Sequence, residues 1–300
     1  MQIREIVRKF LEKEHGGGEL LLALSGGPDS LALFHALLQL RVKFSVAHVN
    51  HGLREESDAE ETKLRQIVED ASIPFFVKRL SLESGGNLEE RARIERYAFF
   101  EQLFSSKPYE AVVLGHHADD QGETLIKRLF EGASLRKWHG IQAVSKRGTL
   151  TLFRPLLTVR KKEIVSWLEK LGVVPFEDWT NLSDQNLRGR LRINLFPHLN
   201  EQFGKDIVSP LLHHQKEVAE CVDLLDELTK HVPLETEVLN IPPLHPALQK
   251  HLIRKWLEHK ETAMAATTLD DLIFSIPLSG KRSFPTQKKP INLVDCKIYF

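Results

Sequence analysis

The sequence predicts an α/β protein with a doubly wound, parallel, Rossmann-like sheet, followed by a smaller helical or mixed C-terminal domain. Two observations lead to this fold class. Short apolar runs alternate with amphipathic stretches over residues 1–131, and parallel strands are the arrangement that needs a crossover helix between them. In addition, a glycine-rich turn joins the first apolar run directly to the next helical stretch, as in sheets that bind nucleotides.

The predicted elements follow one another closely. Apolar residues at helical spacing from Ile3 to Leu11 predict a first helix, and the run from Leu20 to Leu24 predicts a buried strand. The further predicted elements are a helix over 30–40, a strand over 44–49, a helix over 55–71, a strand over 75–77, a helix over 88–104, a strand over 111–114 and a helix over 123–131. Because ligands bind beyond the carboxyl ends of such strands, we expect the functional residues after Leu24, Val49 and Leu114.

The rest of the chain has a different pattern. It becomes mainly helical after about residue 160, and a long amphipathic stretch over 208–231 leads into a segment interrupted by prolines. Residues 291–300 are typical of β-structure. We place the boundary within 203–210, which gives a sheet domain over residues 1–205 and a C-terminal domain over residues 206–300.

Composition argues against several classes of protein. Cys221 and Cys296 are the only cysteines, too few and too far apart for a disulfide framework, a zinc site or a CxxC redox pair. No apolar run reaches the roughly 18 residues that a transmembrane helix needs, so no membrane partner is expected. The N-terminal stretch contains acidic residues and lacks the apolar core of a secretory signal, which predicts a cytoplasmic protein.

Charge is unevenly distributed along the chain, although the formal net charge is zero. Residues 126–200 contain 14 Lys and Arg against 6 Asp and Glu, whereas residues 201–250 contain 4 against 9. Such a basic stretch is a nucleic-acid surface only if folding gathers its charges, and otherwise it is a solvated helix face. Both interpretations remain open from the sequence.

The first candidate site is the turn between the first predicted strand and the next helix. It consists of Ser25, Gly26, Gly27, Pro28, Asp29 and Ser30. Glycines let the backbone approach an anion, and the free amides of a helix start donate hydrogen bonds to it, which favours a phosphate-binding loop over a simple capped turn. No Lys follows as in GxxxxGK[ST], so γ-phosphate transfer of the P-loop kind is disfavoured. Asp29, an acid in an anion site, is best explained as a magnesium ligand.

The second candidate site is HHADDQGET, residues 116–124. Asp119 and Asp120 follow a predicted strand and can face the nucleotide crevice, where adjacent carboxylates hold magnesium or bind an ammonium group. For Asp119, capping of the next helix is an equal alternative. His116 and His117 have no metal-ligand spacing with a further His or Cys, so a structural role or a nucleotide contact is favoured over zinc binding.

These motifs resemble a known family. SGGPDS resembles the PP-loop of the N-type ATP pyrophosphatases, which several enzyme classes share. Further segments resemble, in order, signatures of the tRNA(Ile)-lysidine synthetases: AHVNHGLREES (47–57), ERARIERY (90–97), LGHHADDQGET (114–124), RPLLTVRKKEI (154–164) and EDWTN (177–181). The resemblance covers about residues 18–200, and the combination of HHADDQGET with RPLL is its most specific part.

The resemblance implies an activity. A member of this family uses ATP and Mg²⁺ to ligate L-lysine to C2 of the wobble cytidine of tRNA(Ile) with a CAU anticodon. The product is lysidine, formed through an adenylated cytidine, with AMP and diphosphate released. Residues 1–205 would then be the PP-loop catalytic domain and residues 206–300 a tRNA-binding domain. The sequence leaves the oligomeric state open, a homodimer being one alternative.

The resemblance also implies roles for particular residues. Asp29 and Asp119 would be metal ligands, and Asp120 would orient the lysine substrate. Arg96 would contact the nucleotide and Arg188 would reach the active site.

Six further positions carry expected contacts, alternatives or departures from the family pattern. His48 and His116 are expected to contact the nucleotide, with a strand-end turn as the alternative for His48. Arg192 is expected to contact an RNA phosphate. Trp138 could stack on a base, but packing is favoured. The chain departs from the family at Asn50, where an acid is usual, and at Gly189, which replaces the asparagine of RNxxR.

Overall fold

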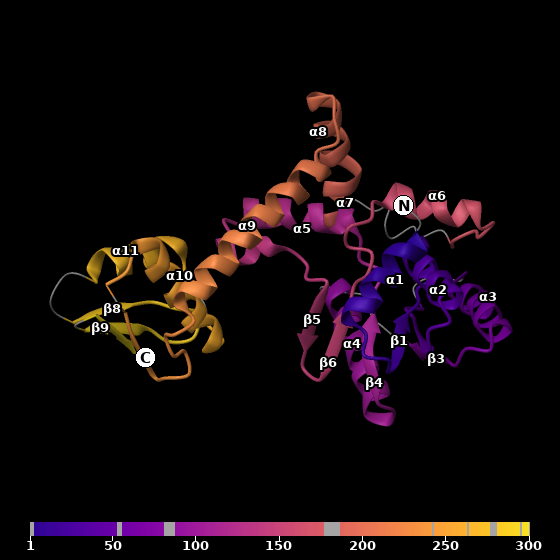
Figure 1. The fold of residues 1–300 in the computed structure, drawn as a ribbon, viewed down its shortest axis with the longest axis horizontal. Helices are drawn as coiled ribbons and strands as arrows, with labels where there is room; N and C mark the ends of the chain where they lie inside the picture. Colours follow the sequence, from indigo (N-terminus) through magenta and orange to yellow (C-terminus); the bar gives the residue numbers. More distant parts are fainter. Residues whose placement is uncertain are drawn as a thin grey trace. The chain divides into compact units, whose positions relative to one another are not determined.

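The chain folds into two compact units in the computed structural model (Figure 1), which describes residues 3–52, 56–80, 88–176, 187–241, 243–262, 264–276, 281–294 and 296–299. The first unit consists of Met1–Thr124 and Ile141–Leu212, and the second of Leu125–Gly140 and His213–Phe300. The segment 125–140 thus groups with the C-terminal part of the chain. No helix in the described ranges is long and apolar enough to cross a membrane.

The first unit is built on a six-stranded sheet with the order β3-β2-β1-β4-β6-β5. Its strands are β1 (Glu19–Ala23), β2 (Phe44–Asn50), β3 (Phe75–Arg79), β4 (Tyr109–Val113), β5 (Val144–Arg147) and β6 (Leu150–Phe153). All neighbours pair in parallel except β5 and β6, which form an antiparallel hairpin. The predicted doubly wound fold is therefore confirmed.

Helices cover both faces of this sheet. They are α1 (Ile3–Glu14), α2 (Pro28–Gln39), α3 (Glu56–Asp70), α4 (Leu88–Ser106) and α6 (Lys161–Lys170). The chain also forms α5 (Ala118–Phe130), α7 (Leu187–Arg190), α8 (Phe196–Phe203) and α9 (Val208–Thr229), with a π-helix, η3 (Leu191–Leu195), between α7 and α8, and both α5 and α9 extend into the second unit. One core contains the apolar residues of α1, α2, α3 and α6, and another contains those of α4. Leu20 and Leu22 face the first core and Leu21 the second, the alternation expected of a strand buried on both faces.

The strand order reverses beside β1, because β2 and β3 extend the sheet to one side and β4 to the other. At such a point the two loops that follow the neighbouring strands diverge and leave a crevice for a ligand. The loop 25–30 follows β1 and the segment 116–124 follows β4. The fold therefore brings both predicted site segments to the same edge of the sheet.

The second unit has its own core. A four-stranded antiparallel sheet of order β7-β10-β9-β8 is formed by β7 (Val238–Asn240), β8 (Arg282–Phe284), β9 (Ile291–Val294) and β10 (Lys297–Tyr299). It packs with α10 (Pro246–His259) and α11 (Ala266–Ser275) around the fully buried Trp256. The predicted β-structure near the C-terminus is confirmed.

The segment 125–140 contains the short 3₁₀ helix η1 (Leu135–His139). Arg136 in η1 forms ion pairs with Asp226 of α9 and Glu258 of α10, which tie this segment into the second unit. The ring of Trp138 packs edge-on against His214, with centroids 6.0 Å apart. The structure thus supports packing for Trp138.

Candidate active site

The loop after β1 forms hydrogen bonds through its own hydroxyl groups. Ser30 Oγ donates to the Gly27 carbonyl at 3.0 Å and accepts the Ser25 amide at 3.2 Å. Gly26 has a φ of +88°, a conformation that side-chain-bearing residues rarely adopt, and a Cβ there would lie 2.3 Å from the Phe176 ring. Gly27 caps α2 and Pro28 begins it, and the amides in the first turn of a helix have no acceptor within the helix. This geometry suits an anion.

The segment after β4 begins a helix earlier than predicted. The sequence predicts Glu123 as the first helical residue, but α5 starts at Ala118. His117 caps the helix, since its Nδ1 accepts the Asp119 amide at 3.2 Å, and the Asp120 carboxylate accepts the His117 amide at 2.9 Å. This reciprocal pair resembles a capping box and explains why the helix can start here. Asp119 and Asp120 consequently lie in the first turn of α5.

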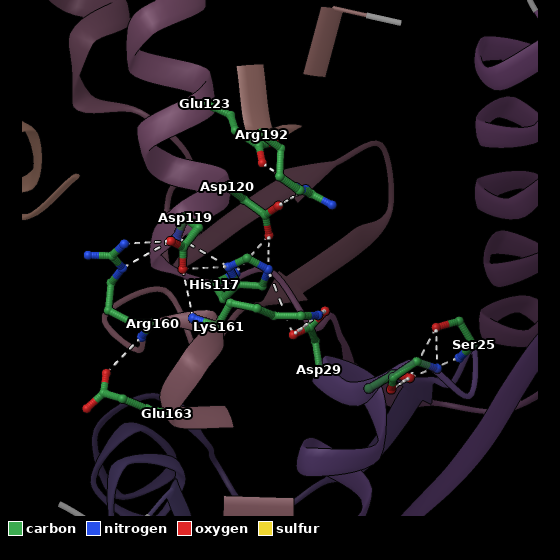
Figure 2. A network of polar contacts seen from close by, with 12 residues as sticks. Ser25, Asp29, His117, Asp119, Asp120, Glu123, Arg160, Lys161, Glu163 and Arg192 are labelled. Carbon is green, nitrogen blue, oxygen red and sulfur yellow. Dashed lines mark hydrogen bonds and ion pairs between the residues drawn. The ribbon is translucent and has the colours of Figure 1, made fainter. Parts of the chain in front are cut away.

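Two basic residues at the start of α6, Arg160 and Lys161, bind the carboxylates of Asp29 and Asp119. Lys161 Nζ lies 2.7 and 2.8 Å from the two carboxylate oxygens of Asp29 (Figure 2). The backbone amide of Lys161 donates to Asp119 at 2.7 Å, and the Arg160 guanidinium pairs with the other Asp119 oxygen at 2.8 Å. Arg160 also pairs with Asp206. Asp119 therefore binds the start of α6.

His117 lies among three carboxylates. Its Nε2 is 3.8 Å from Asp29 and 3.6 Å from Asp120, and its Nδ1 is 3.6 Å from Asp119. Burial opposes protonation of this ring, but the three acids outweigh it, so the pKa of His117 is raised. Burial likewise opposes ionisation of Asp119, yet the neighbouring His117 ring and the hydrogen bonds from Arg160 and the Lys161 amide hold the pKa of Asp119 well below its usual range.

The pKa of His116 is shifted in the opposite direction to that of His117. Burial lowers the pKa of His116 to about 4; Asp120 opposes that shift, whereas the positive charges of Arg154, Arg96 and Arg188 reinforce it. Its Nδ1 is buried and accepts no hydrogen bond from any residue that the structure describes. The ring is therefore neutral near pH 7 and can still take a polar partner. The predicted residues Arg96 and Arg188 are thus both close enough to act on His116.

The end of β2 plays a supporting part. His48 is buried, with Nδ1 2.8 Å from the Leu24 carbonyl, one residue before the loop 25–30. Burial lowers the pKa of His48, so the neutral ring donates to this carbonyl and fixes the end of β1. Asn50 donates to Asp58 at 2.9 Å and to Glu61 at 3.0 Å. These contacts support strand-end roles, and a nucleotide contact by His48 stays a prediction.

Sequence reasoning did not single out two cations of this site, Arg160 and Lys161. Both lie in RPLLTVRKKEI, where a basic pair at a helix start after a strand was an available signal. Arg192 was expected at an RNA phosphate, but its Nε lies 2.8 Å from Glu123 and its Nη2 3.4 Å from Asp120. In the structure α7 and η3 turn this side chain toward α5, and a contact between Arg192 and an RNA phosphate stays a prediction. The motif at 177–181 lies outside the described residues.

The comparisons with known proteins agree with the fold and the loop. A family model described as a PP-loop domain matches residues 1–199. The solved structure of the U34-tRNA thiolase NcsA from Methanococcus maripaludis, which is 16% identical, matches with a TM-score of 0.57 over 78% of this chain and 80% of that chain, and so shares the fold. Fold, loop and family model together define a PP-loop ATP-binding protein.

Curated relatives narrow the class. The tRNA(Ile)-lysidine synthase of Chlamydia muridarum is 37% identical over 79% of this chain and 76% of its own length. That of Chlamydia trachomatis serovar L2 is 39% identical over 74% of each chain. The Protochlamydia amoebophila enzyme is 37% identical over 73% of this chain, which covers 48% of that protein. The chain belongs to the tRNA(Ile)-lysidine synthase family.

Proposed function

We propose that this chain ligates L-lysine to C2 of the wobble cytidine in the CAU anticodon of tRNA(Ile), with ATP as the second substrate. In the first half-reaction the cytosine O2 attacks the α-phosphate of ATP, and the bond to diphosphate breaks. In the second, the lysine ε-amine attacks C2, gives up its extra proton, and expels AMP from the same carbon. The products are lysidine, AMP and diphosphate.

One ring supports this proposal most directly. His117 Nε2 lies within 4 Å of Asp29, in the loop that suits a phosphate, and of Asp120, which suits an ammonium group. A nucleotide on the loop and an amine at Asp120 would therefore be neighbours. Holding two reactants side by side is a large part of what enzymes contribute to such a reaction.

The loop side would bind ATP. The amides at the start of α2 would donate to phosphate oxygens, and the positive helix end adds to this attraction. Lys161 would supply the positive charge that the loop itself lacks, although it enters from a helix that begins 132 residues further along the chain. The neutral ring of His116 is available for the nucleotide, with Arg96 and Arg188 close to it.

The residues present also fit Mg²⁺. Asp29 already holds a cationic group on both carboxylate oxygens, and Mg²⁺ usually takes one or two protein carboxylates together with phosphate oxygens. When bound, it would neutralise charge on the leaving diphosphate. Asp119 would have to release Arg160 and the Lys161 amide to serve as a second ligand. Asp29 is therefore the better candidate.

The amine side would orient lysine. Asp120 keeps one oxygen on the His117 amide and turns the other toward a cation. A carboxylate in this place positions an ammonium group through charge-assisted hydrogen bonds. The deprotonated amine is the nucleophile, so the released proton must reach a nearby base or water.

The C-terminal part, residues 206–300, is proposed to bind tRNA. Its exposed cations include Lys281, Arg282, Lys288 and Lys289, which can contact phosphates without reading sequence. The target cytosine would be splayed from the anticodon stack to reach the loop.

Mass spectrometry of tRNA nucleosides tests the proposal. The protein is incubated with a tRNA(Ile) transcript carrying CAU, ATP, Mg²⁺ and labelled lysine, and digestion should yield labelled lysidine together with AMP. A different added mass, such as sulfur, or an unchanged cytidine would refute the assignment.

Asp120→Asn tests the division of the site into two halves. Asparagine keeps an oxygen that can accept the His117 amide but loses the charge that would attract lysine. Diphosphate should therefore still form, while lysidine should require about 10- to 100-fold more lysine, as loss of a charged hydrogen bond implies. Glu169→Gln, an exposed acid in α6, is the matched control. Unchanged lysine dependence would mean that Asp120 serves only as a cap.

A further inference from the structure

The guanidinium of Arg192 contacts Asp120, at which lysine is proposed to bind, and also contacts Glu123. Its Nε lies 2.8 Å from Glu123 and its Nη2 3.4 Å from Asp120 (Figure 2). The side chains of Asp120 and Glu123 are 14% and 1% exposed, so both acids are shielded from bulk water. They are three residues apart in α5 and share one face of the helix. We call this pair the carboxylate notch.

The carboxylate notch can accept more hydrogen bonds than Arg192 donates to it. The second carboxylate oxygen of Glu123 is buried and accepts no hydrogen bond from any described residue. A buried polar atom in this state costs free energy, which a better-matched donor set would recover. An alkylammonium group carries three donors that can rotate, whereas the fork of a guanidinium is rigid. A second cationic ligand can therefore compete with Arg192 for this place.

The segment that carries Arg192 is suited to local rearrangement. Arg192 lies in η3, a single π-helical stretch of residues 191–195 between two short α-helices. Such π-helical turns are rare, and they occur frequently at functional sites. Rewinding that turn would redirect the side chain without unfolding its neighbours.

The surroundings of Arg192 also favour an anion nearby. Arg188 and Arg190 are exposed in the preceding turn, and a cluster of arginines attracts nucleic-acid phosphates at long range. A phosphate that approaches this segment offers Arg192 a fully charged partner, and arginine binds phosphate in a bidentate manner. The same side chain thus has two competing anionic partners.

We propose that Arg192 is a positioning residue that couples lysine binding to tRNA binding. This inference rests on the proposed function, in which Asp120 binds the lysine ammonium group. Without tRNA, Arg192 fills the carboxylate notch and competes with lysine. A phosphate of the bound tRNA draws Arg192 away, and the vacated carboxylates then accept the amine. Lysine consequently binds after the RNA, when a cytidine is present for it to attack.

Equilibrium dialysis of radiolabelled lysine tests the coupling. The full chain is used with a non-hydrolysable ATP analogue, with and without tRNA(Ile) transcript. We expect wild-type protein to bind lysine about 10- to 100-fold more tightly with tRNA, the range set by exchange of one charged hydrogen-bonded pair. Arg192→Gln should bind lysine tightly without tRNA and show little further gain when tRNA is added.

The sign of the change separates this role from a structural one. If Arg192 only holds the two acids in place, Arg192→Gln weakens lysine binding in both conditions, and the proposal is overturned. Arg190→Gln, the same charge change two residues away, should leave lysine affinity without tRNA unchanged. Arg192→Lys keeps a cation in the notch without the two-pronged contact, and it should show coupling that is reduced but not lost. It also serves if the glutamine variant does not fold.

Failure of the inference can be told from failure of the proposed function. If wild-type protein makes lysidine but binds lysine equally with and without tRNA, the inference alone is wrong. If it makes no lysidine, the proposed function is wrong and the inference falls with it.

Discussion

Lys161→Met should separate the structural from the chemical contribution of the ion pair between Lys161 and Asp29. Methionine keeps most of the length of the side chain and removes its charge. The two side chains are 35% and 24% exposed, and ion pairs in such partly solvated positions contribute about 0.2–1 kcal/mol. We therefore expect the free energy of unfolding to fall by about 1 kcal/mol or less.

The expected effect on the first half-reaction is larger. If Lys161 moves from Asp29 to a phosphate when ATP binds, its loss removes a charge-assisted hydrogen bond of about 1.5–3 kcal/mol. Diphosphate release should then slow by about 10- to 100-fold. Urea denaturation measures the first quantity, and a coupled diphosphate assay with tRNA measures the second. Lys162→Met, an exposed neighbour in α6, should change neither.

A double-mutant cycle with Asp29→Asn completes the test. If the pair matters only to the fold, the two substitutions couple in stability and Lys161→Met turns over ATP at nearly the wild-type rate. A destabilised Lys161→Met protein whose diphosphate release stays within about twofold of wild type would refute the exchange. Lys161 would then serve only to fasten α6 to α2.

Three further predictions follow from the geometry. Gly26→Ala should destabilise the fold by about 2–4 kcal/mol in urea denaturation, because φ is +88° and its Cβ would meet the Phe176 ring; adding Phe176→Leu should restore part of this, and no recovery would exclude the clash. Hydrogen bonds, first of all from Arg79, lower the pKa of Glu61 from 4.5 to about 2. The stabilisation from the ionised Glu61 is therefore fully present above about pH 4.5 and is lost as the pH falls toward 2. Between these pH values the free energy of unfolding should fall by about 1–3 kcal/mol less in Glu61→Gln than in the wild-type protein. An unchanged slope would argue against the pairing. Nuclear magnetic resonance should find His116 neutral down to about pH 5, since burial lowers its pKa to about 4; titration near 6.5 would contradict its burial.

The parallel core of the sheet could be predicted because each of its strands is a short apolar run bounded by turn residues. The hairpin of β5 and β6 could not, since β5 reads VSKR and pairs at the sheet edge, where polar residues are tolerated. The start of α5 was placed too late, at Glu123, whereas the helix begins at Ala118 and includes Gly122. In the structure this glycine lies inside the helix, where a Cβ would come within 3.2 Å of Val208, so close packing explains the glycine.

The candidate site was predictable as far as the topology determines it. Two motifs that follow neighbouring parallel strands must meet at one edge, and the loop 25–30 and the start of α5 do so. The cations were not predictable from spacing. Lys161 pairs with an acid 132 residues away and Arg192 with one 69 residues away. Such pairs depend on how α6 and η3 pack against the sheet unit, which local sequence does not encode.

Charge balance within the first unit links the proposed exchange of Lys161 between Asp29 and ATP with the proposed exchange of Arg192 between Asp120 and tRNA. Asp29, Asp119 and Asp120 would repel a triphosphate and an RNA phosphate if they stood alone, but each is paired with a lysine or arginine from another element. A polyanionic substrate therefore approaches a nearly neutral site. When a phosphate takes over one of these cations, it leaves behind a carboxylate that has lost its partner and can accept a new cation. ATP would in this way prepare Asp29 for Mg²⁺, and tRNA would prepare Asp120 for lysine, so the same principle orders both halves of the reaction.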